Sequence, residues 1–376
     1  MAYGTVNADV IGTSVAGSNL GAGNASIMKN RLINGSMTID QRNAGASQSY
    51  AAGSSTYSLD RWGVDYSQTS KFTSQQNAGS VTPPVGFANY LGFTSSSAYS
   101  ITSTDYFFTE QRIEGFNTSD LGFGTANAKT VTLSFQVYSS LTGTFGGALR
   151  NSAGNRAYPF SYSIPVANTW TTISVTIAGD TTGTWLTTNG IGIRVALGLG
   201  VGTTYSSTAG AWAAGNYLSA TGAVSVVGTS GATFYITGVQ LEVGSSATGY
   251  EYRQIQQELS LCQRYYEKSY NLDVAPATAS QGISLFSSSG NAGGVTTAYI
   301  DTWLQYKVSK RAVPTMACWD EANGSGTCTR TNSGVLATSG QTVSFASVGF
   351  NSVVINSSSG ANAGRISFNW TASAEL

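Results

Sequence analysis

Short runs in which apolar and polar residues alternate dominate the middle of the chain. An alternation with period two gives a β-strand one buried face and one solvent face. Turn residues such as Gly, Ser and Asn separate the runs, and this organisation predicts a mainly β protein with an antiparallel jelly-roll β-sandwich. The clearest runs place apolar residues at Val131, Leu133, Phe135 and Val137, at Ile173, Val175 and Ile177, and at Ile191, Ile193, Val195 and Leu197.

One predicted strand changes phase in its middle. In the segment ATFYITGVQLEVG, Phe234 and Ile236 follow one phase of the alternation, whereas Val239 and Leu241 follow the other. A single extra residue at Gly238 accounts for the change. Such an insertion is a β-bulge, which bends a strand and redirects its side chains.

A helical stripe interrupts the β pattern. Its apolar side chains recur at spacings of three and four, which predicts a helix of about four turns. Two interpretations stay open, because the stripe either packs on the chain's own sandwich or forms a short neck at which identical chains meet. The stripe consists of Tyr252, Ile255, Leu259, Cys262 and Tyr266.

The pattern divides the chain into four parts. Residues 1–30 are small and polar, so we expect them to be disordered or to become ordered by docking onto another protein. Residues 31–250 contain the jelly roll, and residues 251–270 form the helical linker. Alternation returns over residues 271–376, where Phe368 and Trp370 occupy apolar positions of the last strand. This part predicts a second β-sandwich.

Composition excludes several classes of function. Charged residues make up 10% of the chain, against about 25% in an ordinary domain. The 18 basic and 18 acidic residues balance and form no basic cluster, so we expect no nucleic-acid partner. No apolar run is long enough to enter a membrane, and the N-terminal residues lack the features of a signal peptide. We therefore expect synthesis and folding in a cytoplasm.

Catalytic chemistry finds little support. The chain has no histidine for a serine hydrolase and no phosphate-binding loop ending in Gly-Lys-Ser/Thr. Glu110, Arg112 and Glu114 share one side of a predicted strand. A cation between two carboxylates keeps both ionised, which favours an ion ladder over the general acid that a glycosidase needs. We predict that the protein is not an enzyme and assign no catalytic residue.

The three cysteines, Cys262, Cys318 and Cys328, are too few for a disulfide framework and lack the further ligand that a zinc site requires. A disulfide between Cys318 and Cys328 stays open, although folding in a cytoplasm disfavours it. The sequence therefore predicts no metal ligands.

Two groups of aromatic residues are candidates for sugar contact. A pyranose offers an apolar face and a ring of hydroxyls, so it binds aromatic rings that lie beside amides and hydroxyls. For Trp212 the alternative is that it caps the sandwich or fits into a neighbouring subunit. The candidates are Tyr205, Trp212 and Tyr217 in the loop TYSSTAGAWAAGNY, and Trp303, Tyr306 and Trp319 in the C-terminal part.

Five stretches carry a resemblance to a known class of proteins. The chain resembles the tail fibre and receptor-binding proteins of tailed bacteriophages, in particular those with a jelly roll like that of carbohydrate-binding modules. The resemblance covers nearly the whole chain and is most specific between Gly238 and Tyr266. The stretches are KNRLINGSMTIDQRNAG, YSLDRWGVD, FYITGVQLEVGSSATGYEYRQIQQELSLCQRYYEKSY, KRAVPTM and GRISFNWTASAEL.

The resemblance implies a homotrimeric virion component. Residues 1–30 would dock onto other virion proteins, and the C-terminal β-sandwich would form the distal tip. The protein would attach the particle to a bacterial surface glycan or protein by non-covalent binding. Two alternatives stay open, a head fibre or capsid decoration protein with a structural role and a glycan-depolymerising fibre. Jelly rolls of this type often hold a structural calcium ion, for which no ligand is singled out; otherwise no cofactor is expected.

Overall fold

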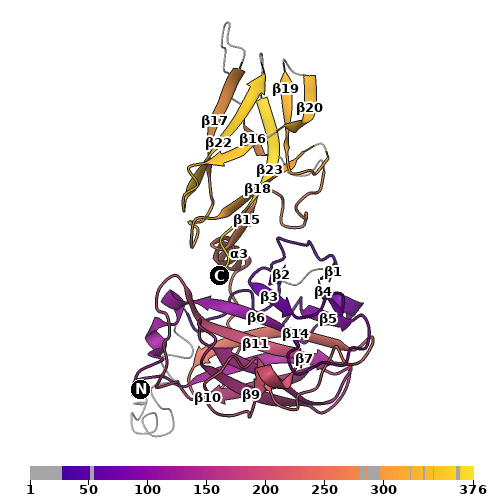
Figure 1. Cartoon of the computed structure of the whole chain (residues 1–376), viewed down its shortest axis with the longest axis vertical. Helices are drawn as coiled ribbons and strands as arrows, with labels where there is room; N and C mark the ends of the chain where they lie inside the picture. The colour runs from indigo at the N-terminus through magenta and orange to yellow at the C-terminus, as the bar shows by residue number, and fades with distance from the viewer. Residues whose placement is uncertain are drawn as a thin grey trace, which may run out of the picture.

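The computed structural model of this chain contains a larger and a smaller β body with one short helix between them (Figure 1). Of the predicted docking segment, residues 28–30 are described and the rest lies outside the described residues. The structure describes residues 28–50, 55–279, 284–286, 297–321, 323–332, 335–341, 343–360 and 365–376.

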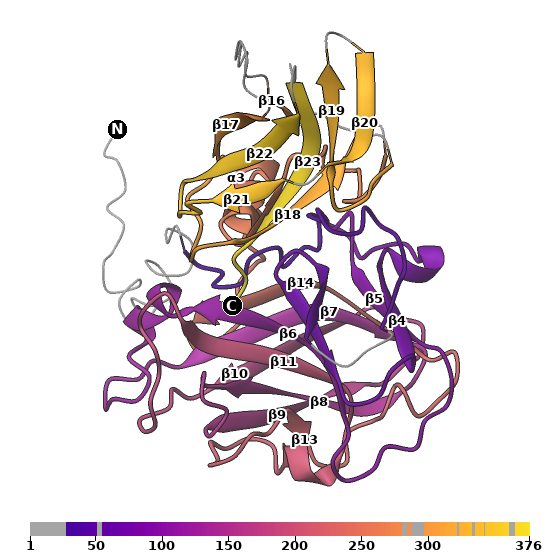
Figure 2. The same ribbon diagram turned by 45° about the horizontal axis from the view of Figure 1, so that its top comes forward.

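Two antiparallel six-stranded sheets form the larger body (Figure 2). We call them the β14 sheet and the β11 sheet, after a long central strand of each. In spatial order the β14 sheet contains β1 (Gln48–Ser49), β4 (Phe72–Gln76), β5 (Leu91–Ser95), β14 (Thr233–Val243), β7 (Val131–Ser139) and β10 (Thr171–Ile177). The β11 sheet contains β2 (Thr56–Leu59), β3 (Trp62–Tyr66), β6 (Tyr106–Glu114), β11 (Ile191–Val201), β8 (Gly143–Arg150) and β9 (Ala157–Ile164).

Short elements connect these strands. One of them, the parallel pair β12 (Ser206–Ser207) and β13 (Ser219–Ala220), belongs to a long excursion between β11 and β14. The 3-10 helices are η2 (Ala78–Ser80), η3 (Gly115–Asn117), η4 (Ser119–Leu121) and η5 (Thr203–Tyr205).

The core of the larger body lies between the two sheets. Leu133 and Phe135 of β7, Ile173 of β10, and Val195 and Leu197 of β11 are buried in one apolar cluster. These are positions that the alternation assigns to the inner face, and the register pairs Phe135 directly with Ile173. The prediction of a mainly β, antiparallel sandwich is therefore confirmed.

The predicted bulge at Gly238 is also confirmed. The register of β14 against β7 shifts between Thr237 and Gln240, and Gly238 has a positive φ of 62°. Both phases of the strand consequently point inward, because Ile236 and Val239 on either side of the bulge are fully buried. A Cβ atom at Gly238 would lie 2.5 Å from the ring of Phe87, so glycine is required here for space as well as for backbone conformation.

The predicted four-turn helix is wrong in length. Helix α3 spans Ile255–Gln263, nine residues. Before it, Gln254 is extended, and the side chain of Arg253 bonds to the main chain of residues 30 and 32. After it, Tyr266 starts strand β15 (Tyr266–Lys268), which pairs with the last strand of the chain. Strand pairing thus overrides the helical spacing at the C-terminal end.

Helix α3 packs on its own chain. Cys262 and Leu259 join Ile33 and Ile39 in a small apolar cluster. The stripe does not form one continuous face, since Ile255 is 52% exposed and Tyr252, which precedes the helix, is 61% exposed. A neck between identical chains stays a prediction, and these two side chains are the members of the stripe still open to a neighbour.

The smaller body is built around its last strand, β23 (Arg365–Ser373). The core contains Phe368 and Trp370, as predicted for the alternating last strand. Strands β15, β16 (Ser284–Phe286), β18 (Thr315–Asp320) and β19 (Cys328–Asn332) pair with β23, and β20 (Val335–Gln341) pairs with β19. A second sheet has the order β17 (Thr297–Gln305), β22 (Ser352–Gly360) and β21 (Ser344–Ala346).

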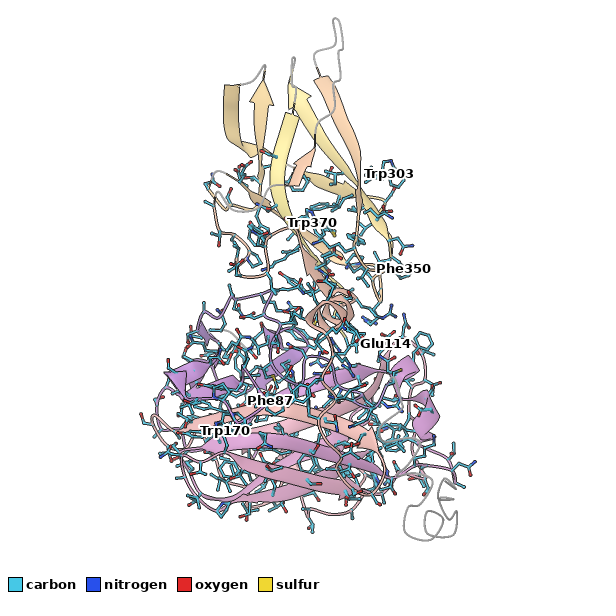
Figure 3. The ribbon with its side chains drawn as sticks, turned by 180° about the vertical axis from the view of Figure 1, so that it is seen from behind. Phe87, Glu114, Trp170, Trp303, Phe350 and Trp370 are labelled. Carbon is cyan, nitrogen blue, oxygen red and sulfur yellow. The ribbon has the colours of Figure 1, made fainter. Side chains whose placement is uncertain are left out.

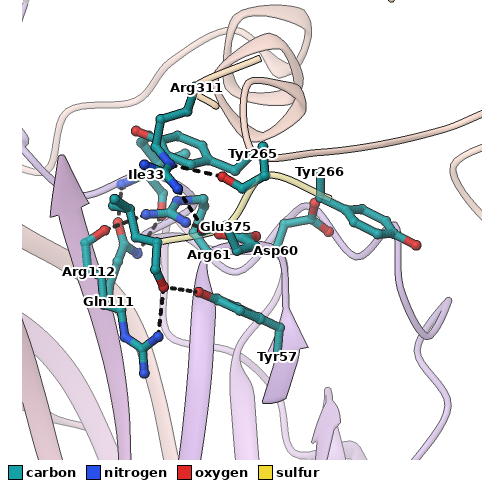
Figure 4. A network of polar contacts seen from close by, with 12 residues as sticks. Ile33, Tyr57, Asp60, Arg61, Gln111, Arg112, Tyr265, Tyr266, Arg311 and Glu375 are labelled. Carbon is teal, nitrogen blue, oxygen red and sulfur yellow. Dashed lines mark hydrogen bonds and ion pairs between the residues drawn. The ribbon is translucent and has the colours of Figure 1, made fainter. Parts of the chain in front are cut away.

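Residues 374–376 tie the two bodies together (Figure 4). The carboxylate of Glu375 accepts hydrogen bonds from Arg42 and Arg61 of the larger body. The guanidinium of Arg61, which is almost fully buried, lies over the ring of Tyr265 at 3.6 Å. Arg311 of the smaller body donates to the main-chain oxygens of residues 374 and 375 at 2.9 and 2.8 Å. This interface is therefore buried, charged and closely hydrogen-bonded.

In the part of the chain that the structure describes, no helix has both the length and the apolar character needed to cross a membrane.

Candidate functional site

Three arginines form a row across the outer face of the β11 sheet. In strand register, Arg194 of β11 lies opposite Arg112 of β6 on one side and Arg150 of β8 on the other. Residues in register on neighbouring strands share a face of the sheet. The flanking residues Ile193 and Val195 are buried in the core, so the arginines lie on the face that points away from the β14 sheet.

The buried carboxylate of Glu110 holds this row together. Its oxygens accept hydrogen bonds from Arg112 Nε at 2.5 Å, Arg150 Nη2 at 2.7 Å and Arg194 Nη1 at 3.0 Å. Burial alone would raise the pKa of Glu110, but the three guanidinium groups outweigh burial and hold this pKa below its usual value. The side chain has no exposed surface. Glu110 therefore acts as a buried ion-pair partner of the three arginines.

Glu114, the other acid of the predicted ladder, lies at the end of β6 beside the linker (Figure 3). Its carboxylate accepts two hydrogen bonds from Arg264 at 2.7 and 2.9 Å and one from the hydroxyl of Tyr265 at 2.7 Å. This bidentate pair joins the sheet to the end of helix α3. Glu114 thus belongs to the contact between the two bodies, whereas Glu110 belongs to the face with the arginine row.

Small residues leave space beside the arginine row. Ala196 and Gly198 follow Arg194 on the outer face of β11. A Cβ atom at Gly146 of β8 would clash with the side chain of Ser219 in β13. Glycine at this position allows the excursion between β11 and β14 to lie directly on the sheet. The excursion then forms a wall over the exposed end of the row.

The wall and the sheet enclose a groove of about 200 Å³. The rings of Tyr106 and Tyr205 meet edge to face, with their centroids 5.4 Å apart. The guanidinium of Arg150 lies over the ring of Phe108 at 5.5 Å. The groove thus combines partly exposed aromatic rings with charged and amide groups. Its lining residues are Asp65, Tyr106, Phe108, Arg150, Arg194, Tyr205, Asn216 and Leu218.

Among the six aromatic residues predicted to contact sugar, Tyr205 lines this groove. Tyr217 lies between the groove residues Asn216 and Leu218 and does not itself line the groove. Trp212 lies at the end of the sandwich, where its ring is within 6 Å of three other aromatic rings and its Nε1 donates to the main-chain oxygen of Ala178 at 2.7 Å. These contacts are those of a ring that caps the sandwich.

The three aromatic candidates of the smaller body are not brought together. Trp303 projects from β17 and is 73% exposed (Figure 3). Tyr306 is buried, and its ring lies 6.0 Å from that of Trp370 in the core. Trp319 of β18 is half-buried. Trp303 therefore offers an open ring face, and its role in binding stays a prediction.

Sequence reasoning missed the polar members of the groove. Arg194 lies inside the run Ile191, Ile193, Val195 and Leu197, which drew attention to the buried face alone. The same alternation assigns Arg194 and the small residues beside it to the outer face. Strand register is what brings Arg150 to that point, and register cannot be read from one strand.

A second hollow of about 190 Å³ lies where the larger body meets the linker. Its aromatic lining consists of Phe87, Tyr250 and Tyr252, whose rings pack against one another with centroids 5.0–5.7 Å apart. Its charged groups, Arg253 and Glu258, form an ion pair at 3.4 Å. These rings and charges already satisfy one another, so the groove beside Tyr205 is the better candidate site.

Within the described ranges, no three acidic or cysteine side chains gather into a set that could hold a metal ion. The structure thus assigns no residues to the calcium ion that the resemblance implies. The disulfide that the sequence left open between Cys318 and Cys328 is not formed, and both side chains are thiols.

No family model and no curated protein matches this chain. Solved structures of similar fold include a tailspike domain described as enzymatically active, from bacteriophage CBA120, with 14% identity and a TM-score of 0.32. The likeness covers 57% of this chain but 21% of that one.

Two further structures are carbohydrate-binding modules. TmCBM61, solved in complex with β-1,4-galactotriose, has 10% identity and a TM-score of 0.30, and the likeness covers 57% of this chain and 99% of the module. A family 11 module of a Clostridium thermocellum cellulase has 14% identity and a TM-score of 0.26, over 53% of this chain and 100% of the module. At these scores, none of the likenesses assigns a function to the chain.

Proposed function

We propose that the protein binds a glycan non-covalently in the groove on the outer face of the β11 sheet. The observation that carries this proposal is the placement of Tyr106 and Tyr205 next to Arg194 and Asn216 in one hollow. A sugar ring needs both an apolar surface and hydrogen-bond partners, and this lining offers both. The groove is smaller than the roughly 300–1,000 Å³ typical for drug-sized ligands, which suits one sugar ring of a longer chain.

We further propose that the protein is a bacteriophage tail fibre component that attaches the particle to its host. The resemblance of the sequence to tail fibre and receptor-binding proteins supports this proposal. The docking role of residues 1–30 and the homotrimer remain part of it. Repeated copies on one particle would strengthen individually weak contacts, so a small groove is sufficient for attachment.

Replacement of Tyr205 by Ala tests the glycan site. The full-length protein and Y205A are applied to an array of bacterial surface polysaccharides, and the bound glycans are then titrated by calorimetry. We expect Y205A to lose at least about tenfold in affinity, because it removes one aromatic wall. Phe116→Ala is the control, since Phe116 is an exposed aromatic residue of the same body that lies outside the groove. Equal binding by Y205A, or the absence of any bound glycan, contradicts the proposed site.

A purified protein that joins virus particles but binds no glycan and does not compete with phage adsorption would have the structural role that the sequence left open.

The mass of the protein in solution tests the proposed homotrimer. Light scattering of the full chain should give about 117 kDa, three times 39.0 kDa. A mass of one chain under conditions in which the glycan binds would contradict the trimer and leave the glycan site intact.

A further inference from the structure

The groove on the outer face of the β11 sheet lies beside a row of charged side chains. Three guanidinium groups, those of Arg112, Arg150 and Arg194, lie in register on adjacent strands. Two carboxylates oppose them, Glu110 at the centre and Asp65, which lies 3.4 Å from Arg112. Like charges in register on neighbouring strands repel one another. The two acids offset part of this repulsion.

Hydrogen bonds engage the guanidinium groups of the row unequally. Arg112 reaches Glu110, Asp65, Ser55 and the main-chain oxygen of Leu376 and is fully engaged. Arg194 donates a single side-chain hydrogen bond, to Glu110, within the described part of the chain.

Arg194 and Arg150 both line the groove, and the side chain of Arg194 is the more accessible of the two. Its side chain retains 21% of its surface exposed, against 5% for Arg150. The groove therefore presents, at Arg194, a partly exposed guanidinium group that makes one side-chain hydrogen bond among the described residues.

We infer that the ligand of this groove is an anionic glycan, and that Arg194 binds its negatively charged group while Tyr205 and Tyr106 pack against the sugar ring. This inference rests on the proposed glycan binding and adds the class of sugar. Guanidinium groups donate paired hydrogen bonds to two oxygens of a carboxylate or of a phosphate, so a ring carboxylate and a phosphate substituent share the chemistry that Arg194 recognises.

The experiment uses the full chain and polysaccharides in matched pairs. Each acidic bacterial polysaccharide is printed beside its carboxyl-reduced form, and each phosphorylated one beside its dephosphorylated form. We expect binding to the charged member and at least about a tenfold loss on its neutral partner, because a charged hydrogen bond contributes about 1.5–3 kcal/mol. The pair that responds identifies the anion as carboxylate or phosphate. Binding should also weaken as sodium chloride rises, since salt screens exposed charges.

Arg194→Gln removes the charge and should cost at least about tenfold in affinity for the acidic member. Glu110 keeps two arginine partners in this variant, so folding is expected and is checked by the melting temperature. The control is Lys129→Gln, which makes the same change in charge at an exposed lysine beside Asp120. R194K, which keeps the charge but not the planar group, should bind between the wild type and R194Q.

Equal affinity for charged and neutral partners, or unchanged binding by folded R194Q, would overturn the anionic class and leave glycan binding standing. The free anions acetate and inorganic phosphate are also titrated. If they bind as tightly as the acidic glycan, the site recognises an adventitious ion only, and the inference fails. If the folded wild type binds no polysaccharide of the array, the proposed function fails together with the inference that rests on it.

Discussion

Glu110 is the residue on which the geometry of the groove depends. Its replacement by Gln leaves three arginines around a neutral amide. Breaking a buried ion pair by removing one partner typically costs about 3–5 kcal/mol, because the remaining charge is left uncompensated. We expect E110Q to lower the free energy of unfolding by about this amount, as measured by urea denaturation.

The matched control for E110Q is Asp120→Asn. Asp120 also accepts two hydrogen bonds from an arginine, Arg31, both at 2.8 Å, but its side chain is 46% exposed. Exposed pairs contribute about 0–1 kcal/mol. Equal losses in the two variants would show that burial does not govern the Glu110 network.

We predict that the stability of the fold depends on pH through the buried carboxyl group of Asp60. Burial raises the pKa of its carboxyl to about 6, although Arg42 and the hydrogen bonds from Gln41 act in the opposite direction. The unfolded chain titrates this group near 3.9, so between pH 4 and 6 the folded state binds more protons. Asp60 therefore contributes stability below pH 4 that is lost as the pH rises through 6.

Asp60→Asn isolates this contribution, because Asn does not titrate. Relative to D60N, the wild type should gain roughly 2–3 kcal/mol of unfolding free energy between pH 7.5 and pH 4, at about 1.4 kcal/mol for each unit of pKa difference. Denaturation of both proteins at the two pH values measures the gain. A difference that stays constant with pH would show that Asp60 is ionised throughout this range.

At the scale of single residues, the sequence predicted that Glu110 forms ion pairs, but it did not predict which residues of other strands lie beside it. The pairing of Arg112 with Glu110 followed from the order of charges along one strand, whereas Glu114, predicted to share that ladder, pairs with Arg264 instead. Arg150 and Asp65 were not predicted, because they reach the site from other strands and their register is set by the whole sheet. Tyr205 was predicted to contact sugar and lines the groove, but its binding stays a prediction. Nothing in its own loop distinguishes it from Trp212, whose ring packs against three other aromatic rings.

At the scale of elements, the bulge in β14 offers a matched pair of substitutions. Gly238→Ala forces a residue with a side chain into positive φ and places Cβ against Phe87. Gly231→Ala imposes a similar φ, 75° in the wild type, with no atom within 4 Å. We expect G231A to cost about 1 kcal/mol from backbone strain and G238A about 1–3 kcal/mol more from overpacking. Thermal unfolding measures both, and equal losses would mean that Phe87 moves aside without cost.

The sequence predicted the strands well but the helix only in part, because a strand pattern and a helix pattern depend differently on distant parts of the chain. Alternation with period two is imposed by a sheet with one buried face, so β7, β10 and β11 follow the pattern over most of their lengths. The stripe from Tyr252 to Tyr266 has helical spacing, but at its end the backbone forms hydrogen bonds with β23 instead of continuing the helix. A local pattern cannot register a partner strand about one hundred residues further along the chain.

At the scale of the whole molecule, residues 374–376 predict that the two bodies unfold together. Glu375 satisfies two largely buried guanidinium groups of the larger body, while Arg311 of the smaller body holds its main chain. Calorimetry of the full chain should therefore show one unfolding transition. Glu375→Gln should separate it into two, because the uncompensated charges of Arg42 and Arg61 weaken the interface by about 3–5 kcal/mol.

The control for E375Q is Glu321→Gln, which makes the same substitution in the smaller body, away from this interface. It should leave the single transition unchanged. If the wild type already unfolds in two steps, the charged interface does not couple the bodies. If E375Q keeps one transition at the wild-type temperature, the apolar contacts of helix α3 with Ile33 and Ile39 are sufficient for coupling. The groove on one body and the exposed Trp303 on the other would keep a fixed distance from each other only where this coupling holds.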